Sequence, residues 1–343
     1  MSSLRCLLRC GWLFPILLGC APAFAGERAG DIEFFGYKGI DVAKVRRALP
    51  VHEGGEYSDR TKDLVRKAVA AAIGKDPTDV AAVCCDERGN RLLFIGLPGA
   101  SYKSFAYNAE PTGKQRLSAD ILGLYERADH ALEAAVRKGG HSAEEDDSKG
   151  YALVNDPAAR TLQLEIHEWA VAHERELLAV LEFSAAVEHR RVAGDALGYA
   201  GQSPEQIRAL VRAARDPDDE VRNNATRALG VLVRSNAALA DRIPPDTFIA
   251  MLNSGTWTDR NKGAALLEQL TAGRNAALLA KIRSLALDSL IEMASWRRMA
   301  HAYMARMVLG RVAGIPEDRL EKLALNGPAD EIVEAISRAA MRP

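Results

Sequence analysis

The sequence predicts an α+β protein that is mostly helical, in which a small βααββ domain is followed by stacked antiparallel helix pairs. The composition is the first observation: 58 Ala and 39 Leu stand among 343 residues, whereas aromatic residues make up only 6%, and this balance favours helices. Second, runs typical of strands are concentrated in residues 30–98. Third, similar helical segments recur at intervals of 32 to 38 residues in the second half of the chain.

The charge balance restricts the class of partner. Basic residues number 45 and acidic residues 46, so the chain is almost neutral overall. Proteins that coat nucleic acid carry a marked basic excess, and we therefore predict no nucleic-acid partner. With 48% hydrophobic and 27% charged residues, the composition is typical of a globular protein.

Residues 1–25 predict an export signal. Arg5 and Arg9 precede an apolar run over 11–19, and Ala23-Phe24-Ala25 supplies the small-x-small pattern that signal peptidases cleave. The apolar run is too short for a membrane-spanning helix, and no later segment is predicted to span a membrane.

A second interpretation of the same segment stays open. Residues 17–20, Leu-Leu-Gly-Cys, resemble a bacterial lipobox, in which Cys20 would be acylated and become the mature N-terminus. Both interpretations place the protein outside the cytoplasm. It is then periplasmic or secreted, or alternatively an outer-membrane-anchored lipoprotein.

Residues 30–98 predict the small domain. Two helices are expected, one beginning after Asp41 and ending at Pro50, and one beginning at Ser58-Asp59. Gly89-Asn90 predicts a hairpin turn because both residues tolerate positive φ. The three strands are expected at 31–35, 80–85 and 91–95.

The opening of this domain resembles a known family. Ile32-Glu33-Phe34-Phe35-Gly36, then Leu49-Pro50, then Glu53 to Asp59 are similar to the polypeptide-transport-associated (POTRA) domain, although only one copy is present. The resemblance implies a periplasmic protein-binding module whose exposed strand edge accepts a strand of a client.

Cys84 and Cys85 are neighbours on a predicted strand. Adjacent strand residues point to opposite faces, so we expect one thiol to be buried and the other partly exposed. A vicinal disulfide or a redox role is the alternative.

Residues 99–174 predict a helical connector. A helix is expected over 119–138 and another from Pro157. Between them, the loop 139–154 carries four consecutive carboxylates, Glu144 to Asp147, without the ligand spacing of a calcium loop. We predict a solvated, flexible loop.

Residues 175–343 predict the repeats. Leu197, Leu229, Leu267 and Met304 occupy equivalent positions in four similar helices, each preceded by another helical run. Each pair is amphipathic and buries its apolar face only by stacking on the next.

One copy, residues 203–230, closely resembles a HEAT repeat through Asp216-Pro217, Val221-Arg222 and Leu229-Gly230. The resemblance implies an α-solenoid of stacked antiparallel helix pairs, in which Arg222 and Arg260 tie turns together. Trp257 and Trp296 are expected to be wedges between repeats.

The chain lacks the phosphate-binding, dinucleotide-binding, zinc-protease and nucleophile-elbow motifs. Its seven histidines are scattered, and His167 and His173 are six residues apart, so they do not share a helix face as a zinc pair does. We therefore predict no catalytic residue, no metal and no cofactor, and expect no enzyme.

These observations predict a non-enzymatic exported bacterial scaffold or adaptor that binds other cell-envelope proteins. The alternative is an enzyme or cofactor-handling, lyase-like HEAT protein, which requires a deep polar pocket where the repeats meet the α/β domain. A third interpretation is a purely structural envelope protein, which needs no transient partner.

Overall fold

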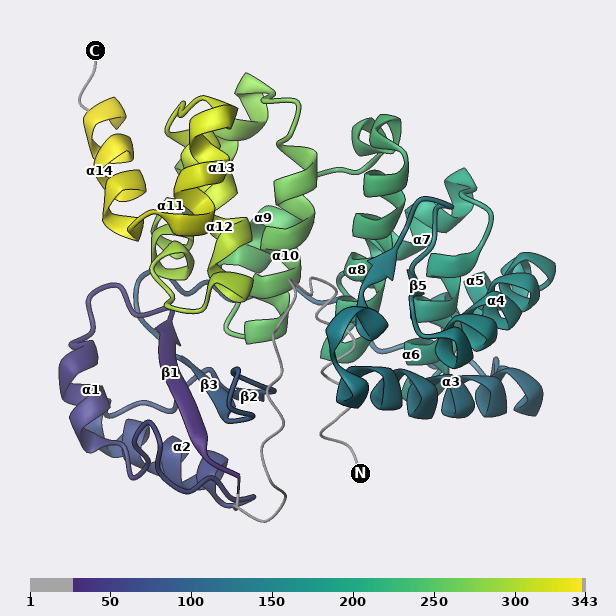
Figure 1. Cartoon of the computed structure of the whole chain (residues 1–343), viewed down its shortest axis with the longest axis horizontal. Coiled ribbons are helices and arrows are strands. Elements are labelled where there is room, and N and C mark those ends of the chain that lie inside the picture. Colours follow the sequence, from purple (N-terminus) through teal and green to yellow (C-terminus); the bar gives the residue numbers. More distant parts are fainter. Residues whose placement is uncertain (1–26, 341–343) are drawn as a thin grey trace. The chain divides into compact units, whose positions relative to one another are not determined.

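The computed structural model describes residues 27–340, which form two compact units (Figure 1). One unit comprises residues 106–247, and the other combines 27–105 with 248–340. The predicted export signal and Cys20 lie outside the described residues. The domain boundaries expected from the sequence, 30–98, 99–174 and 175–343, stay predictions, because they mark changes in element type whereas these units reflect packing.

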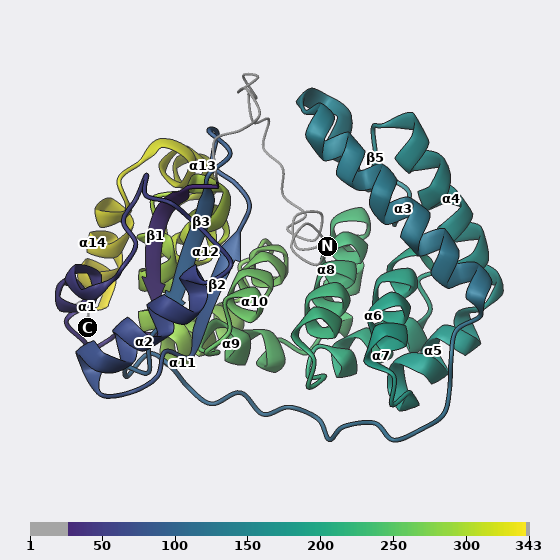
Figure 2. The ribbon, with the colours of Figure 1, turned by 90° about the horizontal axis from the view of Figure 1, so that it is seen from below.

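The α/β module begins the second unit and has the predicted order βααββ. Its strands form one mixed sheet in the order β1-β3-β2, in which β1 is parallel to β3 and β2 is antiparallel to it. Figure 2 shows the three strands side by side. The elements are β1 (Ala29–Phe35), α1 (Val42–Ala48), α2 (Thr61–Ile73), β2 (Asp79–Val83) and β3 (Arg91–Gly96).

Local sequence accounts for the ends of both module helices. The Asp41 side chain accepts a hydrogen bond from the Lys44 N–H and so caps α1. Gly74 ends α2 with a φ of 72°, a left-handed conformation that favours glycine. One sheet face packs on these helices through a shared apolar core, which includes Ile32, Phe34, Val45, Leu49, Val65, Val69, Val80, Leu93 and Ile95.

Strand β2 is shorter than predicted. It ends at Val83, so Cys84 and Cys85 lie beyond it, and the chain then enters the turn that begins at Asp86. Both cysteines are half-buried, and the expectation of one buried and one exposed strand residue is wrong. The physical reason is that the two residues lie between the end of β2 and the turn. Side chains there do not alternate between the two faces of the sheet as strand residues do.

Antiparallel helices complete the second unit. Helix α12 packs against α10, α11, α13 and α14. Among residues 27–340, no helix has the length and apolar composition needed to cross a membrane. The helices are α9 (Asp246–Leu252), whose first two residues belong to the other unit, α10 (Trp257–Leu270), α11 (Ala276–Ala294), α12 (Met299–Val312), α13 (Glu317–Asn326) and α14 (Ala329–Ala340).

The unit formed by residues 106–247 is built from helix pairs. Helix α5 packs on α6, α7 on α8, and α6 on α8, which is the stacking predicted for repeats. Side chains of Asp156, Ser203 and Asp218 cap the N-termini of α4, α7 and α8. The helices are α3 (Ala119–Lys138), α4 (Pro157–Ala172), α5 (Glu174–Phe183), α6 (Val187–Ala196), α7 (Pro204–Ala213) and α8 (Asp219–Ser235).

The acidic loop of this unit is folded onto the helices instead of being solvated along its length. Its strands β4 (Glu145–Asp146) and β5 (Leu153–Val154) form a two-residue antiparallel ladder. Arginines of α4 and α8 form ion pairs with its carboxylates. Each pair compensates one negative charge of the loop and holds the loop against the helices.

Candidate functional site: a sheet with one open edge

The second face of the module sheet is covered by the C-terminal helices of the same unit. The Phe94 ring lies 5.1 Å from the Trp257 ring and 5.0 Å from the Trp296 ring, measured between centroids. The Trp296 indole N–H donates a 3.0 Å hydrogen bond to the Phe34 carbonyl. Both tryptophans therefore join helices to the sheet. The Trp257 ring of α10 also lies 5.5 Å from the His301 ring of α12, so the role of the tryptophans as wedges between repeats stays a prediction.

A buried carboxylate fixes the turn that follows β1. Glu292 of α11 accepts hydrogen bonds from the N–H groups of Gly36 (2.7 Å), Tyr37 (3.0 Å) and Lys38 (3.1 Å). The Arg260 guanidinium lies 3.4 Å from the same carboxylate and is fully buried. Burial and the Glu292 charge together raise the pKa of Tyr37 to about 12. This network holds the module to the helices through charge-assisted bonds.

The register shows which backbone groups point outward at each sheet edge. The N–H groups of Arg91 and Leu97 donate to carbonyls on the β1 side, at Arg28 and Phe35. The backbone N–H and C=O groups of odd-numbered β3 residues therefore point towards β1, and those of even-numbered β3 residues point towards β2. By the same alternation, Ile32 and Phe34 present their backbone groups at the outer edge of β1.

Side chains close the outer edge of β1. The Ile32 N–H donates to Glu53 at 3.2 Å, and the Ile32 carbonyl accepts from Arg46 at 2.9 Å. The Phe34 carbonyl accepts from Trp296, as described above. The Arg297 hydrogen bond with Glu53 is the largest of the effects that lower the pKa of Glu53 to about 2. This edge is therefore not available to another strand.

The outer edge of β2 is different. β2 is the last strand of the sheet, and its pairing with β3 matches Ala81 with Phe94 and Val83 with Leu92. The backbone groups of Val80 and Ala82 consequently point away from β3. Within residues 27–340, no strand pairs with this edge and no side chain is hydrogen-bonded to the backbone of either residue.

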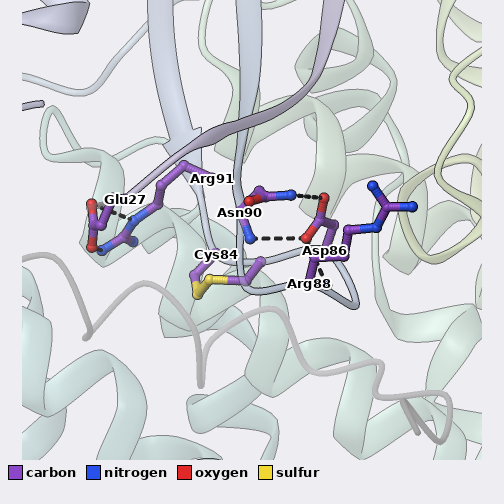
Figure 3. Close-up of a disulfide and its surroundings, with 7 residues drawn as sticks. Glu27, Cys84, Asp86, Arg88, Asn90 and Arg91 are labelled. Atoms are coloured by element: carbon purple, nitrogen blue, oxygen red, sulfur yellow. Dashed lines mark hydrogen bonds and ion pairs between the residues drawn. A yellow bond between two sulfur atoms is a disulfide. The ribbon is translucent and has the colours of Figure 1, made fainter. Parts of the chain in front are cut away.

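A disulfide between the neighbouring residues Cys84 and Cys85 follows this edge strand (Figure 3). The next residue, Asp86, accepts hydrogen bonds from the N–H groups of Arg88 (2.9 Å) and Asn90 (2.8 Å). Burial disfavours the charged form of Asp86, but these hydrogen bonds outweigh it and lower the pKa. The turn thus ends β2 in a fixed position. The vicinal disulfide, which the sequence left as an alternative, is present.

A polar recess of about 400 Å³ lies beside this turn, where the module meets α12 within the same unit. Two arginines, Arg88 and Arg298, line it; Arg298 is bound by the carboxylates of Asp31 and Glu87 and lies 3.5 Å from that of Asp86. The described residues contain no group of three or more His, Cys, Asp or Glu side chains arranged to hold a metal ion. Three carboxylates of the recess, those of Asp31, Asp86 and Glu87, thus share the single guanidinium of Arg298.

The arginines of the repeats donate hydrogen bonds to backbone carbonyls in the turns between helices. Arg222 donates to the carbonyls of Asp216 and Pro217 at 2.9 Å, and Arg260 donates to the Ser254 carbonyl at 2.7 Å. Arg190 plays the same part by binding Asp216.

The two histidines considered as a zinc pair are separate in the structure. His167 stacks on Tyr151, and its Nδ1 lies 2.7 Å from the Tyr199 carbonyl. His173 stacks on Trp169 one turn earlier in the chain. Neither histidine meets the other, as their spacing predicts.

Comparison with known proteins agrees with the helix pairs. Residues 174–244 match the family model of HEAT repeats. The chain therefore carries a HEAT-repeat helical solenoid with a small N-terminal β-containing module, as the sequence predicts. None of the curated proteins compared with it matches.

Two designed armadillo repeat proteins are among the similar solved structures. One, in complex with the peptide (KR)4, is 14% identical with a TM-score of 0.37, and the match covers 54% of this chain and 94% of that chain. The other, designed for modular peptide recognition, is 18% identical with a TM-score of 0.39 over 64% and 97% of the two chains.

Proposed function

We propose that this protein is an exported scaffold of the bacterial cell envelope that binds protein partners, and that one partner adds an extended segment to the outer edge of β2. The observation that carries the proposal is the contrast between the two edges of one sheet. Side chains close β1, whereas the backbone groups of Val80 and Ala82 lack such partners within the described residues. Main-chain hydrogen bonds to such an edge are a recurring mode of peptide recognition.

The chemistry of β2 supports this mode. Val80 and Val83 are buried, Ala81 and Ala82 are half-buried, and no Lys or Pro blocks the strand. Val80 is only 2% exposed, so a partner strand would reach this edge at Ala82. The module and the helical repeats then give one chain two kinds of protein-binding architecture.

Two observations support export. The predicted signal over residues 1–25 is the first. The Cys84–Cys85 disulfide is the second, because disulfides persist in oxidising compartments and are rare in the cytosol. Mass spectrometry of the mature N-terminus distinguishes cleavage after Ala25 from acylation at Cys20.

The enzyme alternative receives less support. It needs polar groups that are available to a substrate, but the carboxylates of the recess bind Arg298. We therefore place the function in binding rather than in catalysis.

The edge is tested with Ala82→Pro, which removes one outward N–H, and with Ala82→Ser as the matched control that keeps it. Each full-length variant captures partners from bacterial envelope extracts, and the captured proteins are quantified by mass spectrometry. We expect Ala82→Pro to lose a defined set of proteins about tenfold, since one or two main-chain bonds contribute on the order of 1.4 kcal/mol.

Fold and specificity have their own control. Ala81→Pro removes an N–H that pairs with β3 and should lower the melting temperature, whereas Ala82→Pro and Ala82→Ser should melt close to wild type. Equal capture by a folded Ala82→Pro variant and by wild type would refute the proposed docking edge.

A further inference from the structure

The ion pairs of the unit formed by residues 106–247 are of two kinds. In the first kind, one arginine holds one carboxylate with two parallel N–H groups. Arg190 binds Asp216 through Nε (2.9 Å) and Nη2 (3.0 Å), and Arg191 binds Asp218 through Nε (2.9 Å) and Nη2 (2.6 Å). This fork is the strongest arrangement of the pair, and it fixes the turns of the repeats.

Arg227 of α8 is of the second kind. Its Nη2 donates to the Glu145 carboxylate of the acidic loop, but its Nε is buried without a hydrogen-bond partner. Only 12% of the Arg227 side chain and 17% of the Glu145 side chain are exposed. A buried charged donor that lacks an acceptor is destabilising, so Glu145 satisfies this arginine incompletely.

The acidic segment 144–148 is held by its charges and a short ladder, whereas Tyr151, Ala152, Leu153 and Val154, which follow it, are buried and anchor the end of the loop. Asp147 binds Arg234 of α8, and Asp146 binds Arg160 of α4 at 3.1 Å. The backbone contributes the two-residue ladder between β4 and β5 and two N–H bonds from residues 155 and 156. Gly140 (φ 58°) and Gly150 (φ 93°) flank the acidic segment with conformations that favour glycine. Such a segment is attached by contacts that another acidic chain is able to replace.

We propose that the Arg227–Arg234 face of α8 is a binding site for an extended acidic segment of a partner protein, and that residues 144–148 of the loop occupy this site until the partner displaces them. The spacing of the groups supports this. Glu145 and Asp147 stand two residues apart, so an extended chain presents them on one side. Arg227 and Arg234 are two helical turns apart and share one side of α8, roughly 10 Å from one another along the axis.

The unused Nε gives the partner an advantage over the loop. Glu145 is held in β4 by its pairing with Val154, and from there it reaches only one nitrogen of Arg227. A carboxylate that enters from a separate chain is free to turn and accept from Nε and Nη2 together, as Asp216 does with Arg190. The exchange replaces one carboxylate by another, so the net charge of the site is conserved. This site lies on α8 and does not depend on the β2 edge.

The test uses the full chain and a fluorescent peptide with the sequence of residues 142–149. The tethered loop competes with the peptide at an effective concentration in the millimolar range. We therefore expect the variant Glu145→Gln/Asp147→Asn, which removes the two loop carboxylates that bind α8, to bind the peptide at least about tenfold more tightly than wild type. Arg227→Gln in that background should weaken binding about tenfold. Arg208→Gln, which breaks an exposed ion pair with Glu205, is the matched control and should leave binding unchanged.

A second measurement covers the case in which removing these two carboxylates disturbs the fold. Wild type with excess peptide is followed by hydrogen–deuterium exchange, and the amides of residues 144–154 should exchange faster as the loop is displaced. The proposal is overturned if the loop stays equally protected, if Arg227→Gln binds as well as its parent, or if a peptide with Gln and Asn at the four acidic positions binds equally.

Discussion

His301 makes the second unit sensitive to acid. The imidazole lies among aromatic rings, 5.2 Å from Phe94 and 5.5 Å from Trp257 between centroids. Burial lowers the pKa of His301 from 6.5 to about 4, and the nearby charges of Lys262 and Arg298 act in the same direction. The neutral imidazole is therefore the form that the fold accommodates.

The size of the effect follows from this shift. One pKa unit corresponds to about 1.4 kcal/mol of folding free energy, so the whole depression represents about 3 kcal/mol. Because the pKa is lowered on folding, the contribution is complete above pH 6.5 and is lost as the pH falls towards 4. At pH 5 the folded state should have lost about 2 kcal/mol through this residue alone.

The assay is urea unfolding at pH 7.5 and pH 5.0, followed by tryptophan fluorescence, for wild type and for His301→Phe. The phenyl ring keeps the aromatic packing but takes up no proton. We expect the loss of unfolding free energy between the two pH values to be about 2 kcal/mol smaller in His301→Phe than in wild type. Comparing each protein with itself removes the effect of the substitution at neutral pH.

The exposed His52 supplies the control, and His52→Asn should lose as much stability between the two pH values as wild type. If His301→Phe also loses as much as wild type, the imidazole does not titrate in the buried setting described, and the reasoning fails.

Three further predictions concern the same unit. Glu292→Gln should lower the free energy of unfolding in urea by about 3–5 kcal/mol, because the buried Arg260 charge loses its anion. Trp296→Phe keeps an aromatic ring but leaves a β1 carbonyl without its donor, and should cost about 1–3 kcal/mol in the same assay. The double variant Cys84→Ala/Cys85→Ala should shift stability by less than about 1 kcal/mol, because a bridge between neighbours closes almost no chain. A larger loss in this variant would show that the disulfide has a structural role.

Much of the fold follows from local sequence signals. Asp41 at a helix start, Gly89-Asn90 in a hairpin and the Leu229-Gly230 spacing are patterns whose physical cause lies within a few residues. The order βααββ and the HEAT-type pairs were predictable for that reason. The predicted strand extended to residue 85 because Cys84 and Cys85 are compatible with a strand locally. In the structure, the turn at Asp86 ends the pairing with β3 earlier, at Val83.

The candidate edge could not be predicted in the same way. β1 is closed by Trp296, whose indole reaches a carbonyl that lies 262 positions earlier in the chain. Such a contact leaves no periodic signal in one sequence, so Trp296 fitted a repeat wedge equally well. The acidic loop gives a second example, because its carboxylates meet Arg227 and Arg234 only after α8 has formed.

The second unit is discontinuous in sequence, since residues 27–105 pack with residues 248–340 while 106–247 form a unit of their own. Synthesis delivers the chain from its N-terminus, so the module emerges long before the helices that carry Glu292 and Trp296. Until those helices arrive, Phe94 remains uncovered and the Phe34 carbonyl at the edge of β1 lacks its donor, and both features favour aggregation. The unit formed by residues 106–247 is synthesised before residues 248–340, so it can fold while the module still lacks its covering helices. Assembly of this protein is therefore ordered by connectivity, and its first strand is among the last elements to be completed.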